Sequence, residues 1–330
     1  MDSGPANNLR QSSIQLESGT GVAATDTKTN PAETTEGVLL DAFSEHQSLL
    51  FAVAYRMLGS AADAEDMLQE TFIRWQNATK GEIESPKAFL VTIITRLCIN
   101  HLQSARVKRE AYFGQWLPEP LVTAPRQNPL ISFEVDESLS LAFLLLLERL
   151  TPAERAVLLL REVFDYEYCE IASILDQTEP SCRQILRRAR QHIKEVRPRF
   201  DATHEQREEL LRKFNEASLQ GDLAGLVALL SKEAVFYSDG GGKAPALPKP
   251  IYGVANISRG ILEGLRKRVP KNLVRRFVEI NGQPGLLSFL DGNPFSAFTI
   301  DVSEGRISHI YVITNPEKLK RLPPLASLSS

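Results

Sequence analysis

The chain of 330 residues lacks several features that would assign it to a class at once. Its three cysteines (Cys98, Cys169 and Cys182) form no CxxC pair, which argues against a disulfide framework or a zinc site and indicates buried thiols in a reducing compartment. No apolar run approaches the ~20 residues that a membrane helix needs. Residues 1–36 lack an apolar stretch and a basic start, so we expect a disordered tail and not a signal peptide.

The chain also lacks a strong excess of either charge. Its net charge is −3 and 43% of its residues are hydrophobic, which is enough for two or three domains with cores of their own. The average charge would repel phosphate groups. Any nucleic-acid contact must therefore come from local basic patches.

Hydrophobic spacing divides the chain into parts. Residues 37–110 have a helical pattern that Gly59-Ser60 interrupts, and Ser85-Pro86 opens another helix, with serine as its cap. Residues 111–133 hold four prolines and are expected to form an irregular linker. Residues 134–199 are again helical in pattern. We expect two helical domains on either side of the linker.

The pattern changes after Phe200. Helices are expected near Glu205–Gln220, Leu223–Leu230 and Val254–Arg268. Strand-like runs with hairpin turns between the later ones predict a curved antiparallel sheet and an α+β domain over residues 200–320, with a tail at 321–330. The five runs are Ala234–Ser238, Leu273–Ile280, Leu286–Leu290, Phe295–Val302 and Ile307–Thr314.

Residues Asp63–Trp75 form an acidic amphipathic pattern. On a helical period, one stripe is apolar (Ala64, Leu68, Phe72, Trp75) and another is acidic (Asp63, Asp66, Glu70). The acidic stripe is either a solvated face of an ordinary helix or a docking surface for a basic partner.

A helix-turn-helix is predicted over Tyr166–Arg199, after a capping box at Thr151–Glu154. Ile171, Ala172 and Leu175 are expected to pack inward from the first helix; Thr178 would cap the second. Arg183–Arg199 holds seven basic residues and one acid, beside a buried stripe of Ile185, Leu186, Ala189 and Ile193. Such helices read base edges with N-terminal side chains and hold phosphates with flanking cations. The candidates for base edges are Ser181, Arg183, Gln184 and Arg187, and those for phosphates are Arg188, Arg190 and Lys194.

A weaker patch lies on the helix that starts near Lys87. It carries amides that can read bases and cations that can follow a phosphate backbone. Its members are Arg96, Asn100, Gln103, Arg106, Lys108 and Arg109.

Together these blocks resemble the bacterial sigma-70 family, of the small extracytoplasmic-function type, over about Asp41–Lys194. The resemblance implies that Asp63–Trp75 grips RNA polymerase, that Ser85–Arg109 binds and melts the minus-ten promoter element, and that Leu150–Arg190 reads the minus-thirty-five element. Asn100 stands where the family often has aspartate. No Trp or Tyr lies between Ser85 and Asn100, so melting would use Phe89, polar pockets and the backbone.

Three short motifs resemble the subgroup whose sigma portion is fused to a SnoaL-like domain: Trp116-Leu-Pro-Glu-Pro120, Asp239-Gly-Gly-Gly-Lys243 and Asn315-Pro-Glu-Lys-Leu319. The implied fold is mainly α, with two helical sigma domains and a C-terminal α+β cone. We expect the loop and the tail motif, which are too polar or too distal for the cone's own core, to touch the sigma portion and regulate it. The regulatory candidates are Trp116, Pro118, Asp239, Gly240, Gly241, Gly242, Lys243, Asn315, Pro316 and Leu319.

The cone predicts a cavity, which Tyr237, Asp239, Asp291 and His309 are expected to line. It could hold an unidentified small ligand. No paired acid and base stand at a catalytic spacing, so we expect no enzyme and no catalytic residue.

The sequence thus predicts a cytoplasmic sigma factor whose partners are RNA polymerase core and promoter DNA, without cofactor, metal or membrane contact. Two alternatives stay open. One is a free-standing helix-turn-helix regulator that binds operators without polymerase, although the acidic helix and the proline-rich linker would then have no role. The other is a SnoaL-like enzyme, which a substrate within reach of an acid or base would favour.

Overall fold

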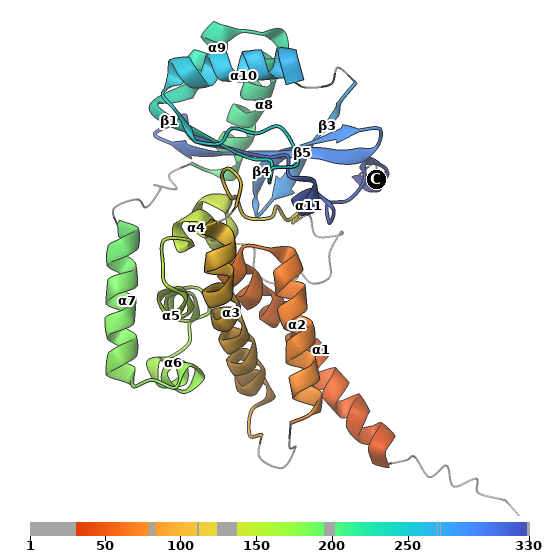
Figure 1. Ribbon diagram of the computed structural model, residues 1–330, viewed down its shortest axis with the longest axis vertical. Helices are drawn as coiled ribbons and strands as arrows, with labels where there is room; N and C mark the ends of the chain where they lie inside the picture. Colours follow the sequence, from red (N-terminus) through yellow and green to blue (C-terminus); the bar gives the residue numbers. More distant parts are fainter. Residues whose placement is uncertain are drawn as a thin grey trace, which may run out of the picture. The chain divides into compact units, whose positions relative to one another are not determined.

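Three helices begin the described part of the chain: α1 Pro31–Leu58, α2 Ala61–Gln76 and α3 Pro86–Glu110 (Figure 1). Gly59 has φ +66°, a left-handed conformation that ends α1. The Ser60 side chain then accepts a hydrogen bond from the Asp63 amide (3.2 Å), and the Ser85 hydroxyl accepts one from the Ala88 amide (3.3 Å). The predicted breaks at Gly59-Ser60 and Ser85-Pro86 are confirmed.

The computed structural model describes residues 31–78, 83–110, 112–123, 137–194, 202–268, 270 and 272–328. Two compact units divide the chain, and Leu39–Ser330 forms the larger one. All contacts below lie within that unit. We call residues 39–194 the helical part and residues 202–328 the C-terminal domain.

The second half of the helical part contains η3 Glu137–Leu139, α4 Leu141–Leu147, α5 Pro152–Glu162, α6 Tyr168–Leu175 and α7 Glu179–Lys194. The predicted capping box between Thr151 and Glu154 is present. The α6–α7 turn passes through Asp176 (φ +54°), and the Thr178 hydroxyl accepts a hydrogen bond from the Ser181 amide (3.3 Å). The predicted helix-turn-helix is confirmed.

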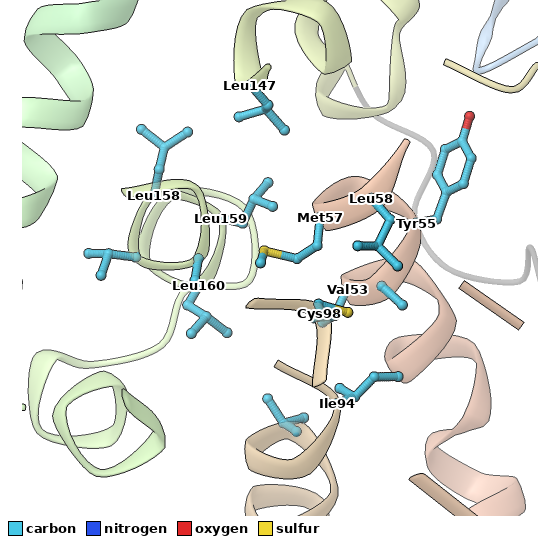
Figure 2. Close-up of a cluster of buried hydrophobic side chains, with 14 of the residues drawn as sticks. Val53, Tyr55, Met57, Leu58, Ile94, Cys98, Leu147, Leu158, Leu159 and Leu160 are labelled. Carbon is cyan, nitrogen blue, oxygen red and sulfur yellow. The ribbon is translucent and has the colours of Figure 1, made fainter. Parts of the chain in front are cut away.

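One apolar core joins both halves of the helical part. Figure 2 shows Met57 pointing from α1 towards Leu159 and Leu160 of α5. The buried Arg155 guanidinium donates to the Met57 carbonyl (2.5 Å) and forms an ion pair with Glu148 (3.0 Å). In this state α5 therefore packs against α1 as part of one core.

The C-terminal domain begins with two helices and continues with a sheet, and a third helix, α10, lies between the second and third strands in the chain. Its elements are α8 His204–Gln220, α9 Leu223–Leu229, β1 Leu230–Asp239, β2 Ile251–Tyr252, α10 Val254–Arg268, β3 Val274–Ile280, β4 Gln283–Leu290, β5 Asn293–Ser303, β6 Arg306–Ile313, α11 Pro316–Leu319 and η4 Leu325–Leu328.

The strand order is β2-β1-β6-β5-β4-β3. The prediction of an antiparallel sheet was wrong at one ladder, because β1 pairs with β6 in parallel, with Phe236 opposite Ile310. The chain leaves β1, passes through α10 and three further long strands, and returns beside β1 in the same direction. Strand β2 was missed because two residues carry no periodicity. The expected fold class, mainly α with a C-terminal α+β domain, is confirmed.

Both faces of this sheet are buried. Phe298, Ile300 and Val302 pack on one face with α8, α9 and α10. Leu287 and Phe289 of β4 and Ile313 of β6 pack on the other face. That second core also takes in the linker residues Leu117 and Val122 and the α4 residues Leu141 and Ala142. The helical part therefore covers this face of the sheet together with Leu319 and Leu322 of the C-terminal domain itself.

Cys98 and Cys182 are buried, but Cys169 is exposed, so the expectation of three buried thiols was wrong for Cys169. Helix α6 turns Ile171 and Ile174 inward and leaves Cys169 on the outer side. Within the described ranges, no helix is long and apolar enough to cross a membrane, and no group of three metal-ligating side chains occurs.

Candidate polymerase, promoter and regulatory interfaces

The acidic helix α2 packs its apolar stripe inward as predicted: Ala64, Leu68 and Trp75 are buried, and Phe72 packs against the same core. Its acidic stripe remains accessible. Asp66 is exposed, and Glu70 forms a surface ion pair with Arg74 (2.8 Å). Asp63 lies 3.6 Å from the His101 ring nitrogen. Exposed pairs of this kind contribute little to stability, so a partner can replace them.

Glu119, which the sequence analysis did not select, caps α2 from the linker. Its Oε2 atom accepts hydrogen bonds from the amides of Ala61 (2.8 Å) and Ala62 (3.2 Å) and from the Ser60 hydroxyl (3.3 Å). Burial raises the pKa of this carboxyl, against the lowering effect of these donors and of Arg321. The helix N-terminus favours the anion there. The Trp116–Pro120 motif thus holds the start of the acidic helix.

The C-terminal domain also touches α2 directly. The Arg321 guanidinium, just after α11, forms an ion pair with Glu65 (2.6 Å). This residue was not predicted either; it lies in the segment assigned to a tail. The acidic helix α2, which can attract a basic partner, therefore already has the Arg321 cation of the same chain bound beside its acidic stripe.

Helix α7 carries most of the candidate base-reading and phosphate-binding side chains outward. Ile185, Leu186, Ala189 and Ile193 form the predicted buried stripe. Arg183 pairs with Glu179 (2.8 Å) and lies over the Tyr168 ring (4.6 Å). Arg190 pairs with Glu162 (2.6 Å). Ser181 is half-buried; Gln184, Arg187 and Arg188 are exposed, and the Lys194 side chain lies outside the described residues.

The weaker patch on α3 is only partly available. Asn100 and Gln103 are exposed. The Arg96 guanidinium instead donates to the carbonyls of Ile174 (2.8 Å) and Ser173 (3.2 Å) at the end of α6. The Phe89 ring packs beside Trp75, with ring centres 5.9 Å apart. The side chains of Arg106, Lys108 and Arg109 lie outside the described residues.

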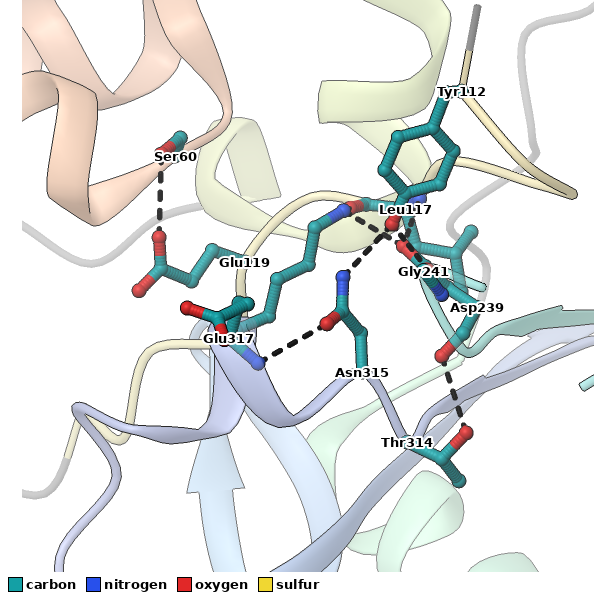
Figure 3. A network of polar contacts seen from close by, with 10 residues as sticks. Ser60, Tyr112, Leu117, Glu119, Asp239, Gly241, Thr314, Asn315 and Glu317 are labelled. Atoms are coloured by element: carbon teal, nitrogen blue, oxygen red, sulfur yellow. Dashed lines mark hydrogen bonds and ion pairs between the residues drawn. The ribbon is translucent and has the colours of Figure 1, made fainter. Parts of the chain in front are cut away.

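Asp239 is the centre of the contact between the linker and the C-terminal domain (Figure 3). It is fully buried, so the expectation that this loop is too polar for a core was wrong at this residue. Its Oδ1 accepts from the Tyr112 hydroxyl (2.6 Å) and the Gly241 amide (2.9 Å), and its Oδ2 accepts from the Leu117 amide (2.9 Å). Lys318 forms an ion pair with the same Oδ2 (2.7 Å). A buried carboxylate is tolerated because each of its oxygens has donors.

The tail motif completes this contact. The Asn315 side chain donates to the Tyr112 hydroxyl (2.9 Å) and accepts from the Glu317 amide (3.1 Å) at the start of α11. Lys318 donates to the Leu117 carbonyl and lies 4.4 Å from the centre of the Trp116 ring. The structure therefore brings all three motifs together. Pro118, Gly240 and Leu319 are buried, whereas Gly242, Lys243 and Pro316 are exposed.

Asn281, in the β3–β4 turn, makes a second contact that sequence analysis missed. Its side chain accepts from the Leu121 amide (2.9 Å) and donates to the Tyr55 hydroxyl (2.7 Å) and the Leu139 carbonyl (3.0 Å). The only sequence signal was the Asn-Gly pair of a hairpin turn, which indicates a turn and not an interface.

The cavity of the C-terminal domain lies on the opposite face of the sheet and has a volume of about 420 Å³. The predicted lining was wrong. Phe236 and Ser238 line it, whereas Tyr237 and Asp239 point the other way because side chains alternate along a strand. His309 stacks with Tyr237 (6.2 Å), and Asp291 is exposed in a turn.

Comparisons with known proteins agree with this geometry. The Sigma-70 region 2 model matches residues 42–107, and the Sigma-70 region 4 model matches residues 140–193. The ECF RNA polymerase sigma factor SigJ of Mycobacterium tuberculosis is 34% identical over 298 residues, which cover 85% of this chain and 94% of SigJ. The probable ECF sigma factor SigI of the same species is 30% identical over 292 residues, covering 85% of this chain and 94% of SigI.

The crystal structure of M. tuberculosis SigJ matches with a TM-score of 0.70 at 31% identity, covering 84% of this chain and 97% of SigJ. The similarity therefore extends beyond the two sigma regions into the C-terminal domain. Taken with the helix-turn-helix, the acidic helix and the fused cone, it shows that this chain belongs to the extracytoplasmic-function (ECF) RNA polymerase sigma factors.

Proposed function

We propose that this sigma factor binds core RNA polymerase through α2 and promoter DNA through α3 and α7, and that its C-terminal domain holds it in a closed form. The protein would work in the cytoplasm, where polymerase acts. The chemistry of transcription is the polymerase's own. The residues described around the cavity include no Asp, Glu, His, Lys, Tyr or Cys that could serve as a general acid or base.

Polymerase binding is assigned to the acidic stripe because Asp66 and Glu70 lie off the buried face of α2. Replacing both with lysine should leave the helical circular dichroism unchanged and weaken the affinity for core polymerase in a titration. The matched control reverses Glu209 and Glu263, which form similar i,i+4 pairs on α8 and α10. Unchanged core affinity in the first variant would show that the stripe is only a solvated face.

Promoter reading is assigned to α7. Arg183→Ala and Gln184→Ala should each cost about 1–3 kcal/mol of discrimination at one base pair. Arg190→Ala should weaken all promoters alike. Run-off transcription from a set of single-base promoter variants separates the two effects. The isolated chain should bind DNA poorly at physiological salt; tight and specific binding without polymerase would favour the operator-binding regulator.

The closed form is inferred from the contact between α3 and α6. Promoter elements centred about 25 base pairs apart lie about 85 Å apart along B-form DNA, at about 3.4 Å per base pair. The minus-ten candidate Arg96 instead hydrogen-bonds to the end of α6, within the helix-turn-helix. While α3 and α6 are in contact, the protein cannot bind the minus-ten and the minus-thirty-five promoter elements at the same time. Promoter binding therefore requires the two halves of the helical part to separate.

The observation that carries the regulatory role is the buried Asp239, which ties the linker between those two halves to the C-terminal domain. Spin labels on the exposed native Cys169 and on Gln69→Cys, which is exposed on α2, would report the separation. The distance between labels should increase when core polymerase and promoter are added. Asp239→Asn should favour the longer distance and raise run-off transcription, whereas the exposed control Asp291→Asn should not. Lower transcription would identify the domain as a scaffold and not a brake.

A further inference from the structure

The cavity of the C-terminal domain is apolar on most of its surface. It is bordered by α8, α10, residues 244–247 and one face of the sheet, and its volume of about 420 Å³ lies in the range of small-molecule sites. Phenylalanines from three different elements line it: Phe214 of α8, Phe236 of β1, and Phe295 and Phe298 of β5.

Arg275 of β3 places a cation against this apolar space. Its guanidinium donates to the Asn215 side chain (2.9 Å), which is neutral. Among the described residues, no carboxylate pairs with Arg275, and burial lowers its pKa. A guanidinium remains charged even so. A partly buried charge without a counter-charge is unfavourable, and an anion in the cavity would relieve that cost.

Further polar groups lie on the same side of the cavity. Ser288 stands opposite Arg275 in the β3–β4 ladder, and Ser296 stands opposite Ser288 in the next ladder. The Ser218 residue, one turn after Asn215 on α8, also borders the cavity, and its hydroxyl is buried without a hydrogen-bond partner. By contrast, the Ser238 hydroxyl on the far side accepts from the Leu247 amide (2.8 Å). Several polar side chains therefore border the cavity near Arg275.

We propose that this cavity binds an amphipathic monocarboxylate, with its carboxylate on Arg275 and its apolar body among the phenylalanines. An arginine fork matches a carboxylate with two parallel hydrogen bonds. The proposal deepens the regulatory role given above and rests on it for its biological purpose.

The same segments that line the cavity also hold the helical part. Residues 244–247 line it directly after the Asp239–Lys243 loop, and the Leu247 carbonyl accepts from Gln115 of the linker (3.1 Å). Pro316 and Leu319 line it on either side of Lys318, which pairs with Asp239. A ligand that shifts these segments therefore changes the contact that keeps the chain closed.

Isothermal titration calorimetry of the full-length protein tests the binding site. The probes are hexanoate, octanoate, decanoate and 4-phenylbutyrate, and the neutral match for the last is 4-phenylbutan-1-ol. At least one carboxylate should bind at a single site, and 4-phenylbutyrate should bind about tenfold or more tightly than the alcohol. No binding by any probe, or equal binding of the acid and the alcohol, would overturn the proposal.

Two variants locate the anion. Arg275→Met should abolish the preference for the acid, while Arg275→Lys, which keeps the cation, should retain part of it. The control is Arg276→Met, because Arg276 is exposed on the same strand and points away from the cavity. Thermal unfolding without ligand shows whether each variant is folded. Loss of the preference in Arg276→Met, or its full retention in Arg275→Met, would contradict the assignment.

Coupling is read from the distance between labels on Cys169 and Gln69→Cys, with and without the carboxylate that binds. A ligand-dependent change, absent in Arg275→Met, is expected. An unchanged distance would overturn the coupling. Core polymerase binding without ligand is measured separately: a chain that binds the carboxylate but not polymerase would disprove the proposed function and leave the cavity site intact.

Discussion

The two faces of the C-terminal sheet differ in how they treat charge. On the face towards the helical part, Asp239 is fully buried and its two oxygens together accept from the linker, the Gly241 amide and Lys318 of α11. On the face towards α8 and α10, Arg275 borders a cavity with only a neutral amide as its partner. On the first face the buried charge is fully paired within the chain, as in a finished interface. On the second face the charge has no counter-charge among the described residues, as in a site that binds an anionic ligand.

The largest effect is expected from Asp239→Asn. It removes the negative charge from a buried ion pair with Lys318, whose side chain is 11% exposed. Breaking such a pair costs about 3–5 kcal/mol. Chemical denaturation of the full chain measures the loss. In the double variant Asp239→Asn/Lys318→Met the total should be smaller than the sum of the single effects; simple additivity would show that the two residues do not act as a pair.

Asn281 gives the next largest expected effect. Asn281→Gly keeps the positive φ of +53° but removes the side chain that satisfies the Leu121 amide, the Tyr55 hydroxyl and the Leu139 carbonyl. Unpaired buried polar groups should lower the free energy of unfolding by about 2–3 kcal/mol. The exposed Asn293→Gly serves as the control. Equal unfolding midpoints for the two variants would rule out a role for Asn281 in holding this face.

Gly59→Ala probes the linker side of the same face. A Cβ at Gly59 would lie 2.7 Å from the Trp116 ring, and the left-handed backbone there costs an alanine about 1–2 kcal/mol. Gly221 has a similar φ of +71° and no atom within 4 Å of an added Cβ. Gly221→Ala therefore carries the backbone cost alone. The excess loss in Gly59→Ala, measured by denaturation, reports the Trp116 contact; no excess would mean that the ring moves away freely.

The smallest effect should have the opposite sign. Gly264 lines the cavity from α10, and an added Cβ meets nothing within 4 Å. Gly264→Ala should stabilise the protein by about 0.5–1 kcal/mol, because alanine is the better helix former. Gly260→Ala, where Ile251 lies 3.3 Å from the new atom, should gain less. A loss of stability at Gly264 would indicate that this face is packed as tightly as the other.

Local signals in the sequence predicted the local structure well. The Thr151–Glu154 capping box and the Thr178 cap appear where expected, because a few residues determine each of them. The partners of β1 could not be predicted in the same way, since hydrophobic alternation does not reveal which distant strand pairs with it. The cavity lining was wrong for a related reason: at Tyr237 and Asp239, a shift of one residue moves a side chain to the opposite face.

For the candidate site too, local features could be predicted from the sequence and contacts between distant residues could not. The outward side chains of α7 and α2 could be read from helical periodicity. Arg96, Asn281 and Arg321 could not, because their partners lie 77 or more residues away in sequence and no local pattern marks them. Lys318 belongs to the Asn315–Leu319 motif, but the sequence does not mark it as a contact residue. Its role depends on the Asp239 carboxylate, which lies near it only in the folded chain.

The apolar cover over Leu287, Phe289 and Ile313 gives opening a thermodynamic signature. Since Leu117, Val122 and Leu141 supply that cover, separating the linker and α4 from the sheet would bring water onto both surfaces. Hydration of apolar area raises the heat capacity by about 0.45 cal/K/mol per Å². Calorimetry of polymerase binding over a range of temperatures would therefore distinguish two kinds of opening. If the linker and α4 separate from the sheet, the heat-capacity change of opening should be positive; if they only shift along the sheet and its apolar residues stay buried, that contribution should be absent.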